Sequence, residues 1–453
     1  IIGSNITSVS TNTTHVEKLN IKTLNGTTAV TALALDVDGM VVDASSLGGG
    51  AAFTHVASGI ITPTNAYGNV NLSDYSSILG GSGNSISGSG NNSGAVIVGG
   101  VYNSISLFNG SAIIGGGVFN IINSTGSIIG GGERNEIKEN SSFFSNISGG
   151  KFNLISSSES VIAGGRGNEI GLSSDNSIIA GGRGNTISAS TWSAIVGGDT
   201  NNITDSTLSF IGGGINNTVS GSSHSFIGGG DTNNIEPLSF NSVIGGGELN
   251  VVTGARKSFI GAGERNEISV FNSFIGSGYE NKIISTSFSS KENSIIGGRL
   301  NLIEGVSNVS TIVGGNSNII TGGTSSTIGG GQKNQIHKTR SSSIAGGEEN
   351  NIYGNFSTIA GGSGNTVSHP NSHIIGSNIT SVSANTTHVN KFNIGTLNGT
   401  TSVVALGLDT NNMVVSATTG GGFVTSITTI GTSGTSTITG GVLNIPEYSG
   451  FIH

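Results

Sequence analysis

The sequence predicts an all-β protein whose main body is a parallel β-solenoid, and three observations support that prediction. Gly accounts for 78 of the 453 residues, which disfavours long helices. Hydrophobic residues account for 34% of the chain, too many for a disordered linker. One phrase recurs about every 16.5 residues over about two thirds of the chain, a unit too short for a helix pair or a propeller blade. Each repeat fits one coil of two short strands and two turns.

The repeated phrase consists of an apolar pair, two or three small residues, two variable residues, Asn, one more residue, and Ile or Val, as in residues 113–122, 178–187 and 259–268. The Gly residues after the apolar pair are expected to permit positive φ and a close backbone approach. The Asn is expected to adopt a left-handed conformation or lie at a turn, and to hydrogen-bond from coil to coil. The 18 ladder positions are Asn84, Asn103, Asn120, Asn135, Asn153, Asn168, Asn185, Asn201, Asn217, Asn233, Asn250, Asn266, Asn281, Asn301, Asn318, Asn334, Asn350 and Asn365.

The phrase hardly varies in length, so the variation lies in the Ser/Asn/Gly-rich stretch that leads to the next apolar pair. One edge of each coil is therefore expected to be a variable loop. Coils stacked about 4.8 Å apart would form a rod of roughly 85 Å.

The apolar pairs predict self-association. Neighbouring residues on a strand point to opposite faces, so Ile178 and Ile179, or Phe210 and Ile211, cannot both face the inside of a thin coil. An apolar face repeated in all 18 coils would favour an obligate homo-oligomer of parallel chains, in which an identical chain buries one member of each pair.

The phrases from residues 77–80 (Ser-Ile-Leu-Gly) to 358–361 (Thr-Ile-Ala-Gly) resemble a known family. They are similar to the head domains of trimeric autotransporter adhesins, the YadA-like β-roll. The spacing itself gives about 18 coils of 15–20 residues. The resemblance implies a left-handed roll and an intertwined parallel homotrimer. The triple Gly, the Asn and the slightly longer coils depart from that family.

Modules of another kind flank the array, because residues 1–43 recur at 374–416 with a constant offset of 373. Asn-Gly and Asp-Gly between alternating apolar runs predict β-hairpins that cap the solenoid. The chain is thus expected to be one period of a longer tandem fibre. The predicted parts are the last coil of a preceding array (1–6), a hairpin connector or cap (7–50), a lead-in (51–75), the repeat array (76–379), a second copy of the connector (380–419) and a C-terminal fibre connector (420–453).

Residues 425–448 closely resemble a connector that is common in bacteriophage tail-fibre and related virion proteins. This resemblance implies a structural, non-enzymatic, extracellular fibre on a virion surface, which attaches to a host cell-surface glycan or protein receptor. The alternative is a cellular adhesin of the trimeric autotransporter type. An ice-binding solenoid would need a regular Thr array, whereas Thr186, Thr218 and Thr366 share their position with Ser, Glu, Asn and Lys.

Composition argues against other partners. The formal charge is −8 and no basic run occurs, which disfavours nucleic acid as a partner. No stretch of about 18 apolar residues occurs, so no membrane insertion is expected. The chain has no Cys, so disulfides and thiolate metal sites are excluded.

No catalytic, cofactor-binding or metal-binding constellation is predicted. The eight His residues are scattered, and the Asp36-Val37-Asp38-Gly39 turn keeps one carboxylate in its second copy, which favours a hairpin over a calcium loop. Trp192 is the best single candidate for stacking on a sugar. One variable slot after the Gly residues is expected to form an exposed ladder without fixed chemistry. It holds Glu133, Asp199, Asp231, Glu248, Glu264 and Glu348, and also Lys151, Arg166, Arg183, Arg299, Tyr279 and Val118.

Overall fold

The computed structural model describes residues 68–70, 76–87, 94–106, 110–138, 143–287 and 289–391, together with the backbone of short strands outside these ranges. The chain divides into two compact units, Ile1–Glu264 and Arg265–His453. The predicted parallel β-solenoid is confirmed: the described residues are all-β and form about 19 turns. The intertwined homotrimer stays a prediction. Within the described residues, no helix has the length and hydropathy needed to cross a membrane.

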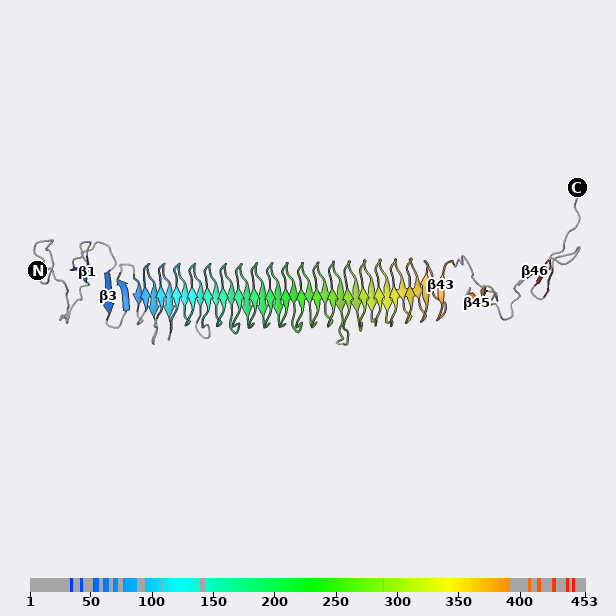
Figure 1. Ribbon diagram of the computed structural model, residues 1–453, viewed down its shortest axis with the longest axis horizontal. Helices are drawn as coiled ribbons and strands as arrows, with labels where there is room; N and C mark the ends of the chain where they lie inside the picture. The colour runs from blue at the N-terminus through cyan, green and yellow to red at the C-terminus, as the bar shows by residue number, and fades with distance from the viewer. Residues whose placement is uncertain are drawn as a thin grey trace, which may run out of the picture. The chain divides into compact units, whose positions relative to one another are not determined.

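Unit 1 stacks its coils so that each contributes one strand to each of two parallel sheets (Figure 1). The A sheet contains β4 (Ile60–Thr64), β6 (Ser77–Ile78), β8 (Val96–Ile97), β10 (Ile113–Ile114), β12 (Ile128–Ile129), β14 (Asn146–Ile147), β16 (Val161–Ile162), β18 (Ile178–Ile179), β20 (Ala194–Ile195), β22 (Phe210–Ile211), β24 (Phe226–Ile227), β26 (Val243–Ile244) and β28 (Phe259–Ile260). The B sheet contains β5 (Val70–Asn71), β7 (Ser85–Ser87), β9 (Ser104–Ser106), β11 (Ile121–Ile122), β13 (Glu136–Ile137), β15 (Leu154–Ile155), β17 (Glu169–Ile170), β19 (Thr186–Ser188), β21 (Asn202–Thr204), β23 (Thr218–Ser220), β25 (Asn234–Ile235) and β27 (Val251–Val252).

Unit 2 is built from the same coil. Its A sheet contains β30 (Phe274–Ile275), β32 (Ser294–Ile295), β34 (Thr311–Ile312), β36 (Thr327–Ile328), β38 (Ser343–Ile344), β40 (Thr358–Ile359), β42 (His373–Ile375) and β43 (Thr387–Val389). Its B sheet contains β29 (Glu267–Ile268), β31 (Lys282–Ile284), β33 (Leu302–Glu304), β35 (Ile319–Thr321), β37 (Gln335–His337), β39 (Asn351–Ile352) and β41 (Thr366–Val367).

The core of each coil consists of one aliphatic residue from each sheet. In the coil that contains β18 and β19, Ile179 and Ile187 are fully buried, whereas Ile178 is 47% exposed. The parallel register places Ile179 beside Ile195 of the next coil and Ile187 beside Ile203. The second member of each apolar pair therefore fills the inside, and the first member points outward.

A buried amide ladder closes one edge of the coil, which we call the Asn edge. Asn201 donates its backbone N–H to Asn185 Oδ1 at 2.9 Å, and its Nδ2 donates to Gly197 O at 2.9 Å and to Gly214 O at 3.0 Å. All 18 predicted ladder Asn side chains are buried, at 0 or 1% exposure. Each of them has hydrogen-bond partners inside the stack, as a buried polar group needs.

Two rows of buried hydroxyls close the opposite edge, which we call the Ser edge. Ser193 donates its N–H to Ser177 Oγ at 3.2 Å and its own hydroxyl to Ser206 O at 2.9 Å. Ser206 donates its N–H to Ser190 Oγ at 2.9 Å. The sequence predicted only a variable loop here, so this internal Ser-x-x-Ser ladder is a new structural element of the coil.

The structure confirms that the length variation lies at the Ser edge. From the buried A-sheet residue to the buried B-sheet residue the chain always advances eight positions, as from Ile179 to Ile187. The return takes seven positions from Ile352 to Ile359 and twelve from Ile283 to Ile295.

The outward apolar row does not extend through every coil, which corrects the expectation of an apolar face repeated 18 times. Unit 2 begins the row with Phe274, but Ser or Thr then faces outward in β32, β34, β36, β38 and β40. In unit 1 the row begins with Ser77 and is then almost wholly apolar, with Asn146 as the polar member among Val96, Ile113, Ile128, Val161, Ile178, Ala194, Phe210, Phe226, Val243 and Phe259.

The flanking hairpins are confirmed at the level of the backbone. Strands β1 (Leu33–Leu35) and β2 (Val41–Asp43) pair antiparallel, and β44 (Leu406–Leu408) pairs with β45 (Val414–Ser416) in the same register 373 positions later. Strand β3 (Ala52–Val56) pairs antiparallel with β4, and β46 (Ser426–Thr428), β47 (Thr437–Thr439) and β48 (Val442–Asn444) form a three-stranded sheet.

The solenoid extends past both predicted ends of the array. In unit 1, β5 joins the B sheet ahead of residue 76, and Asn69 Oδ1 accepts the N–H of Asn84 as the first rung of the ladder. In unit 2, β43 continues the A sheet beyond residue 379. The residues before 68 and after 391 lie outside the described side chains, so the predicted preceding coil at 1–6 falls outside the described part.

Candidate binding surface

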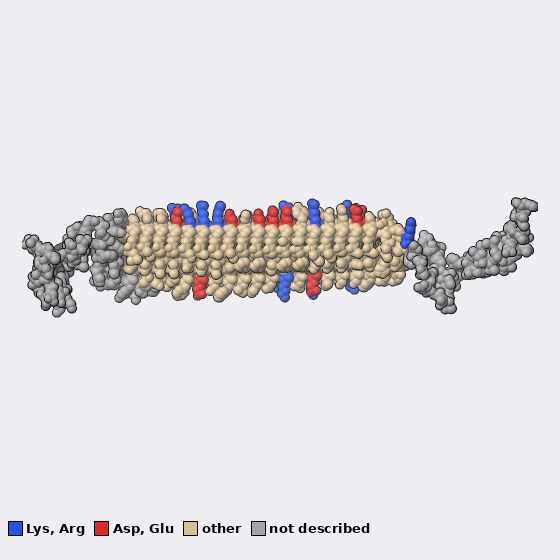
Figure 2. All heavy atoms as spheres, turned by 45° about the horizontal axis from the view of Figure 1, so that its top comes forward, with Lys and Arg blue, Asp and Glu red and all other residues tan. Residues whose placement is uncertain are grey.

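The predicted slot after the Gly residues forms one continuous row of the Asn edge in each unit. Each slot residue makes an isolated parallel bridge with the slot residue of the next coil. Figure 2 shows that charged side chains gather along one edge of the stack and are sparse on the opposite edge. In unit 1 the row runs Ser82, Val101, Val118, Glu133, Lys151, Arg166, Arg183, Asp199, Ile215, Asp231, Glu248 and Glu264, and in unit 2 it includes Tyr279, Arg299, Asn316, Gln332, Glu348 and Ser363.

A second row lies beside the slot, and its backbone is left-handed. These residues directly precede the ladder Asn. The left-handed residue is therefore not the Asn itself, and the prediction of a left-handed Asn was wrong. Gly fills the position at Gly83, Gly167, Gly184 and Gly364, but bulky side chains fill it in several other coils at a cost of about 1 kcal/mol each. The bulky members in unit 1 include Tyr102 (φ 53°), Phe119 (57°), Arg134 (54°), Phe152 (59°) and Leu249 (56°).

Four of these left-handed residues form an aromatic and cationic column. The rings of Tyr102 and Phe119 stack with their centroids 5.1 Å apart and an interplanar angle of 11°. Arg134 then places its guanidinium carbon 5.5 Å from the centroids of both Phe119 and Phe152. The column is exposed on its outer rim, because Tyr102 is 55% exposed and Phe152 38%. Such a cation between aromatic faces is favourable, and sequence reasoning missed it because it arises only when coils stack.

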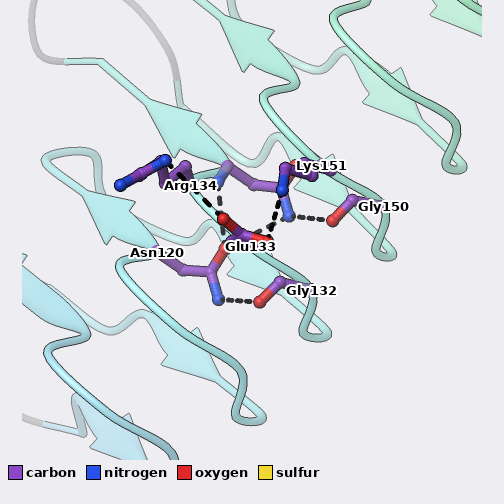
Figure 3. Close-up of polar contacts among 7 residues, drawn as sticks. Asn120, Gly132, Glu133, Arg134, Gly150 and Lys151 are labelled. Carbon is purple, nitrogen blue, oxygen red and sulfur yellow. Dashed lines mark hydrogen bonds and ion pairs between the residues drawn. The ribbon is translucent and has the colours of Figure 1, made fainter.

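Ion pairs link the slot residues beside this column (Figure 3). Lys151 Nζ lies 2.7 Å from Glu133 Oε2, and Arg134 lies 3.6 Å from the other carboxylate oxygen. The hydrogen bond from Lys151 lowers the pKa of the Glu133 carboxyl. Below them, Asn120 Nδ2 donates to Gly132 O at 3.0 Å, so the charged pairs stand directly on the amide ladder.

The predicted acids do not converge on one point. Asp199 lies 3.9 Å from Arg183, while Asp231, Glu248 and Glu264 follow one another along the row. In unit 2, Arg299 lies over the Tyr279 ring at 5.2 Å, and Lys333 pairs with Glu349 at 3.2 Å. Among the described residues, no group of three His, Asp or Glu side chains is placed to hold a metal ion. The row offers charge and hydrogen bonding along a line.

Trp192 lies on the Ser edge, away from this row. It has left-handed φ of 57° and is 62% exposed. Its backbone N–H donates to Asp175 O, which fixes the turn but leaves the indole at the surface. The same corner of the next coil holds Leu208, which is 50% exposed. The same corner of the previous coil holds Asn176, so the structure places Trp192 between one apolar and one polar neighbour.

The His residues remain separate. His337 stacks on Tyr353 with a centroid separation of 4.6 Å, and burial lowers the pKa of its imidazole. His388 is 8% exposed and its Nε2 lies 2.7 Å from Thr386 Oγ1. His224, His369 and His373 lie in other coils, and His15, His55 and His453 lie outside the described side chains.

Comparison with known proteins gives no assignment for this chain: no family model matches it, and no curated protein is significantly similar to it.

Proposed function

We propose that this chain is a structural, non-enzymatic segment of an extracellular fibre, part of a phage or virus tail fibre that attaches to a host cell surface. Stacked coils with internally satisfied amide and hydroxyl ladders suit a mechanical role, because each coil is stabilised by its neighbours. Loops and exposed edges repeated along such a fibre would make many weak contacts and gain avidity. The resemblance of residues 425–448 to tail-fibre connectors supports the virion over other settings.

The observation that carries the proposal is the outward apolar row of unit 1. Ile178 is 47% exposed, and Phe210 and Phe226 stack with centroids 5.2 Å apart on the same face. Ten apolar residues, interrupted once by Asn146, lie at about 4.8 Å spacing in a strip about 50 Å long. Monomeric proteins rarely leave such a strip in water. Copies of this chain in parallel register present identical strips, so we assign the strip to the centre of a homotrimer.

Light scattering tests the oligomer. The parent chain is expected at three times its mass of 45.1 kDa, and a folded monomer would contradict the assignment. The double variant Ile178→Asp, Phe226→Asp is expected to dissociate or aggregate. The matched control is Thr186→Asp, Thr218→Asp, which places the same charges outward on β19 and β23 of the opposite sheet. The control is expected to remain a trimer.

Immunogold electron microscopy on the source material tests whether the fibre belongs to a virion or to a cell envelope. Antibody against the repeat array is expected to label fibres attached to virus particles. Labelling of the cell envelope with none on particles would instead favour a cellular adhesin of the trimeric autotransporter type.

A further inference from the structure

The column of side chains on the Asn edge is interrupted at two consecutive coils of unit 1. Gly167 and Gly184 fill the left-handed position there, with φ of 65° and 63°. A Cβ atom added to Gly167 would have no heavy atom within 4 Å, and one added to Gly184 would meet Thr200 Oγ1 at 3.7 Å. The gap runs from the coil of Phe152 to the coil of Thr200, three coil spacings or about 14 Å. We call this gap the Phe152 notch.

Phe152 forms one wall of the notch. Arg134, one coil earlier, covers one face of its ring, with its guanidinium carbon 5.5 Å from the centroid. Gly167 lies one coil later, since its N–H donates to Lys151 O. Lys151 Nζ also lies 5.0 Å from the centroid, and it pairs with Glu133 of the same coil as Arg134. Phe152 as a whole is 38% exposed, and the coil on its other side carries no side chain at this position. An open aromatic face above bare backbone suits the C–H face of a pyranose ring.

Basic side chains line the side of the notch. Arg166 and Arg183 are bridge partners in the slot row, so their guanidinium groups start from adjacent coils. Within the described part of the chain, Arg166 has no ion-pair partner, and Arg183 has only the 3.9 Å contact with Asp199, at 72% side-chain exposure. Guanidinium groups bind carboxylates in fixed, often bidentate geometry. This basic stretch lies in a chain whose net charge is −8.

We propose that the Phe152 notch binds an acidic sugar residue of a surface glycan. The pyranose ring stacks on Phe152 above Gly167, and its carboxylate pairs with Arg166 and Arg183. The inference rests on the proposed function, because it names the class of glycan that the fibre would meet on a host surface. A neutral sugar would use the ring face but leave Arg166 without an anion and Arg183 with only its contact to Asp199.

Calorimetric titration of the full 453-residue chain tests the proposal with matched probes. The acidic probes are hexagalacturonate and an oligosialic acid, and the neutral probe is hexagalacturonate with its carboxylates methyl-esterified. At least one acidic probe is expected to bind, and hexagalacturonate at least about tenfold more tightly than its ester. The proposal is overturned if neither acidic probe binds at about 1 mM, or if the ester binds as well as the acid.

Variants separate the notch from simple charge attraction. Gly167→Asn fills the notch without changing charge, and the fold accepts Asn at this position because Asn216 occupies it with φ of 53°. Both Gly167→Asn and Arg183→Gln are expected to weaken binding at least about tenfold. The controls Thr232→Asn and Arg299→Gln introduce the same side chains in the same two rows at other coils, and they are expected to bind like the parent. Unchanged binding by Gly167→Asn would overturn the notch as the site.

Failure of this site and failure of the proposed function remain distinguishable. Gold on virion fibres without acidic-glycan binding would reject only the notch. Notch-dependent glycan binding together with gold on the cell envelope alone would reject the virion setting and keep the site.

Discussion

The two edges of each coil differ in how much change in length they accept. The Asn edge lies within an interval that is eight positions long in every coil, whereas the interval across the Ser edge ranges from seven to twelve. Both edges are lined by buried polar groups that bond to the next coil. A corner tolerates no change in length when one side chain makes several of its hydrogen bonds at once.

The chemistry of the two ladders explains this difference. Asn201 bonds to Gly197 O of its own coil, to Gly214 O of the next coil and to Asn185 of the previous coil. A residue inserted at this corner would break all of these hydrogen bonds. Ser206 accepts only the N–H of Ser222, at 2.9 Å, while its hydroxyl donates to Thr204 O within its own turn. Asp205, between the B strand and the first Ser, donates its backbone N–H to Ser188 O at 3.1 Å but adds no side chain to the ladder, so a change in length here disturbs fewer bonds.

The largest expected effect comes from inserting Gly-Ser into one edge or the other. Between Asp199 and Thr200 the insertion should destabilise the protein by about 4 kcal/mol or more, because the amide bonds of that corner are lost together. Between Thr204 and Asp205 it should cost less than about 1 kcal/mol, since lengthening a surface loop has a small entropic penalty. Urea unfolding followed by circular dichroism measures both. Equal losses would contradict the distinction between the edges.

Asn201→Asp should be the most damaging single substitution. It removes the two Nδ2 donors to Gly197 O and Gly214 O and places a carboxylate beside their carbonyl oxygens in a fully buried site. A loss of about 3 kcal/mol is expected. Asn216→Asp makes the same change at an exposed position one coil later and should alter the unfolding free energy by less than about 0.5 kcal/mol. A small effect at Asn201 would show that the ladder does not stabilise the fold.

The repeated positions made the interior predictable from the sequence, and the outer surface less so. The buried Ile and the ladder Asn recur at fixed spacing, so periodicity revealed both. The Ser ladder was missed because the segment from the buried B-sheet residue to the first ladder Ser, as from Ile187 to Ser190, differs in length between coils. The Ser residues therefore do not recur at a fixed spacing. Asn69 was missed because no Gly pair precedes it. The column from Tyr102 to Phe152 depends on bulky residues in left-handed conformations and on stacking between coils, which no local pattern indicates.

Gly198→Ala tests the backbone of the Asn edge and should have a smaller effect. Gly198 has φ of 90°, and an added Cβ would overlap Gly214 O and lie 2.6 Å from Asn201 Nδ2. We expect a loss of about 2 kcal/mol. The neighbouring Gly197 has no heavy atom within 4 Å of an added Cβ and is not left-handed, so Gly197→Ala should change stability by less than about 0.5 kcal/mol. Comparable losses for both variants would mean that the close approach is relieved by movement of the stack.

Ser206→Ala provides the counterpart on the Ser edge. The substitution removes the hydroxyl's bond to Thr204 O and leaves Ser222 N–H without its acceptor, but unlike Asn201→Asp it adds no buried charge. A loss of about 1 kcal/mol is expected. Ser220→Ala, on the outer face of β23, should lie within about 0.5 kcal/mol of the parent. A loss as large as that of Asn201→Asp would make the two ladders equivalent and leave the length difference unexplained.

The smallest expected effect is a pH dependence at His337, where the chain leaves β37 for the Ser edge. Burial against Tyr353 lowers the pKa of His337, and Nε2 is buried without a hydrogen-bond partner among the described residues. A His whose pKa is lower in the folded state stabilises the fold above its unfolded pKa, near 6.5, and loses that contribution as the pH falls through the folded value. The midpoint of thermal unfolding should therefore fall further between pH 7.5 and pH 5 in the parent than in His337→Gln. Equal falls in both proteins would show that the imidazole is hydrated in solution and that this part of the Ser edge opens to water.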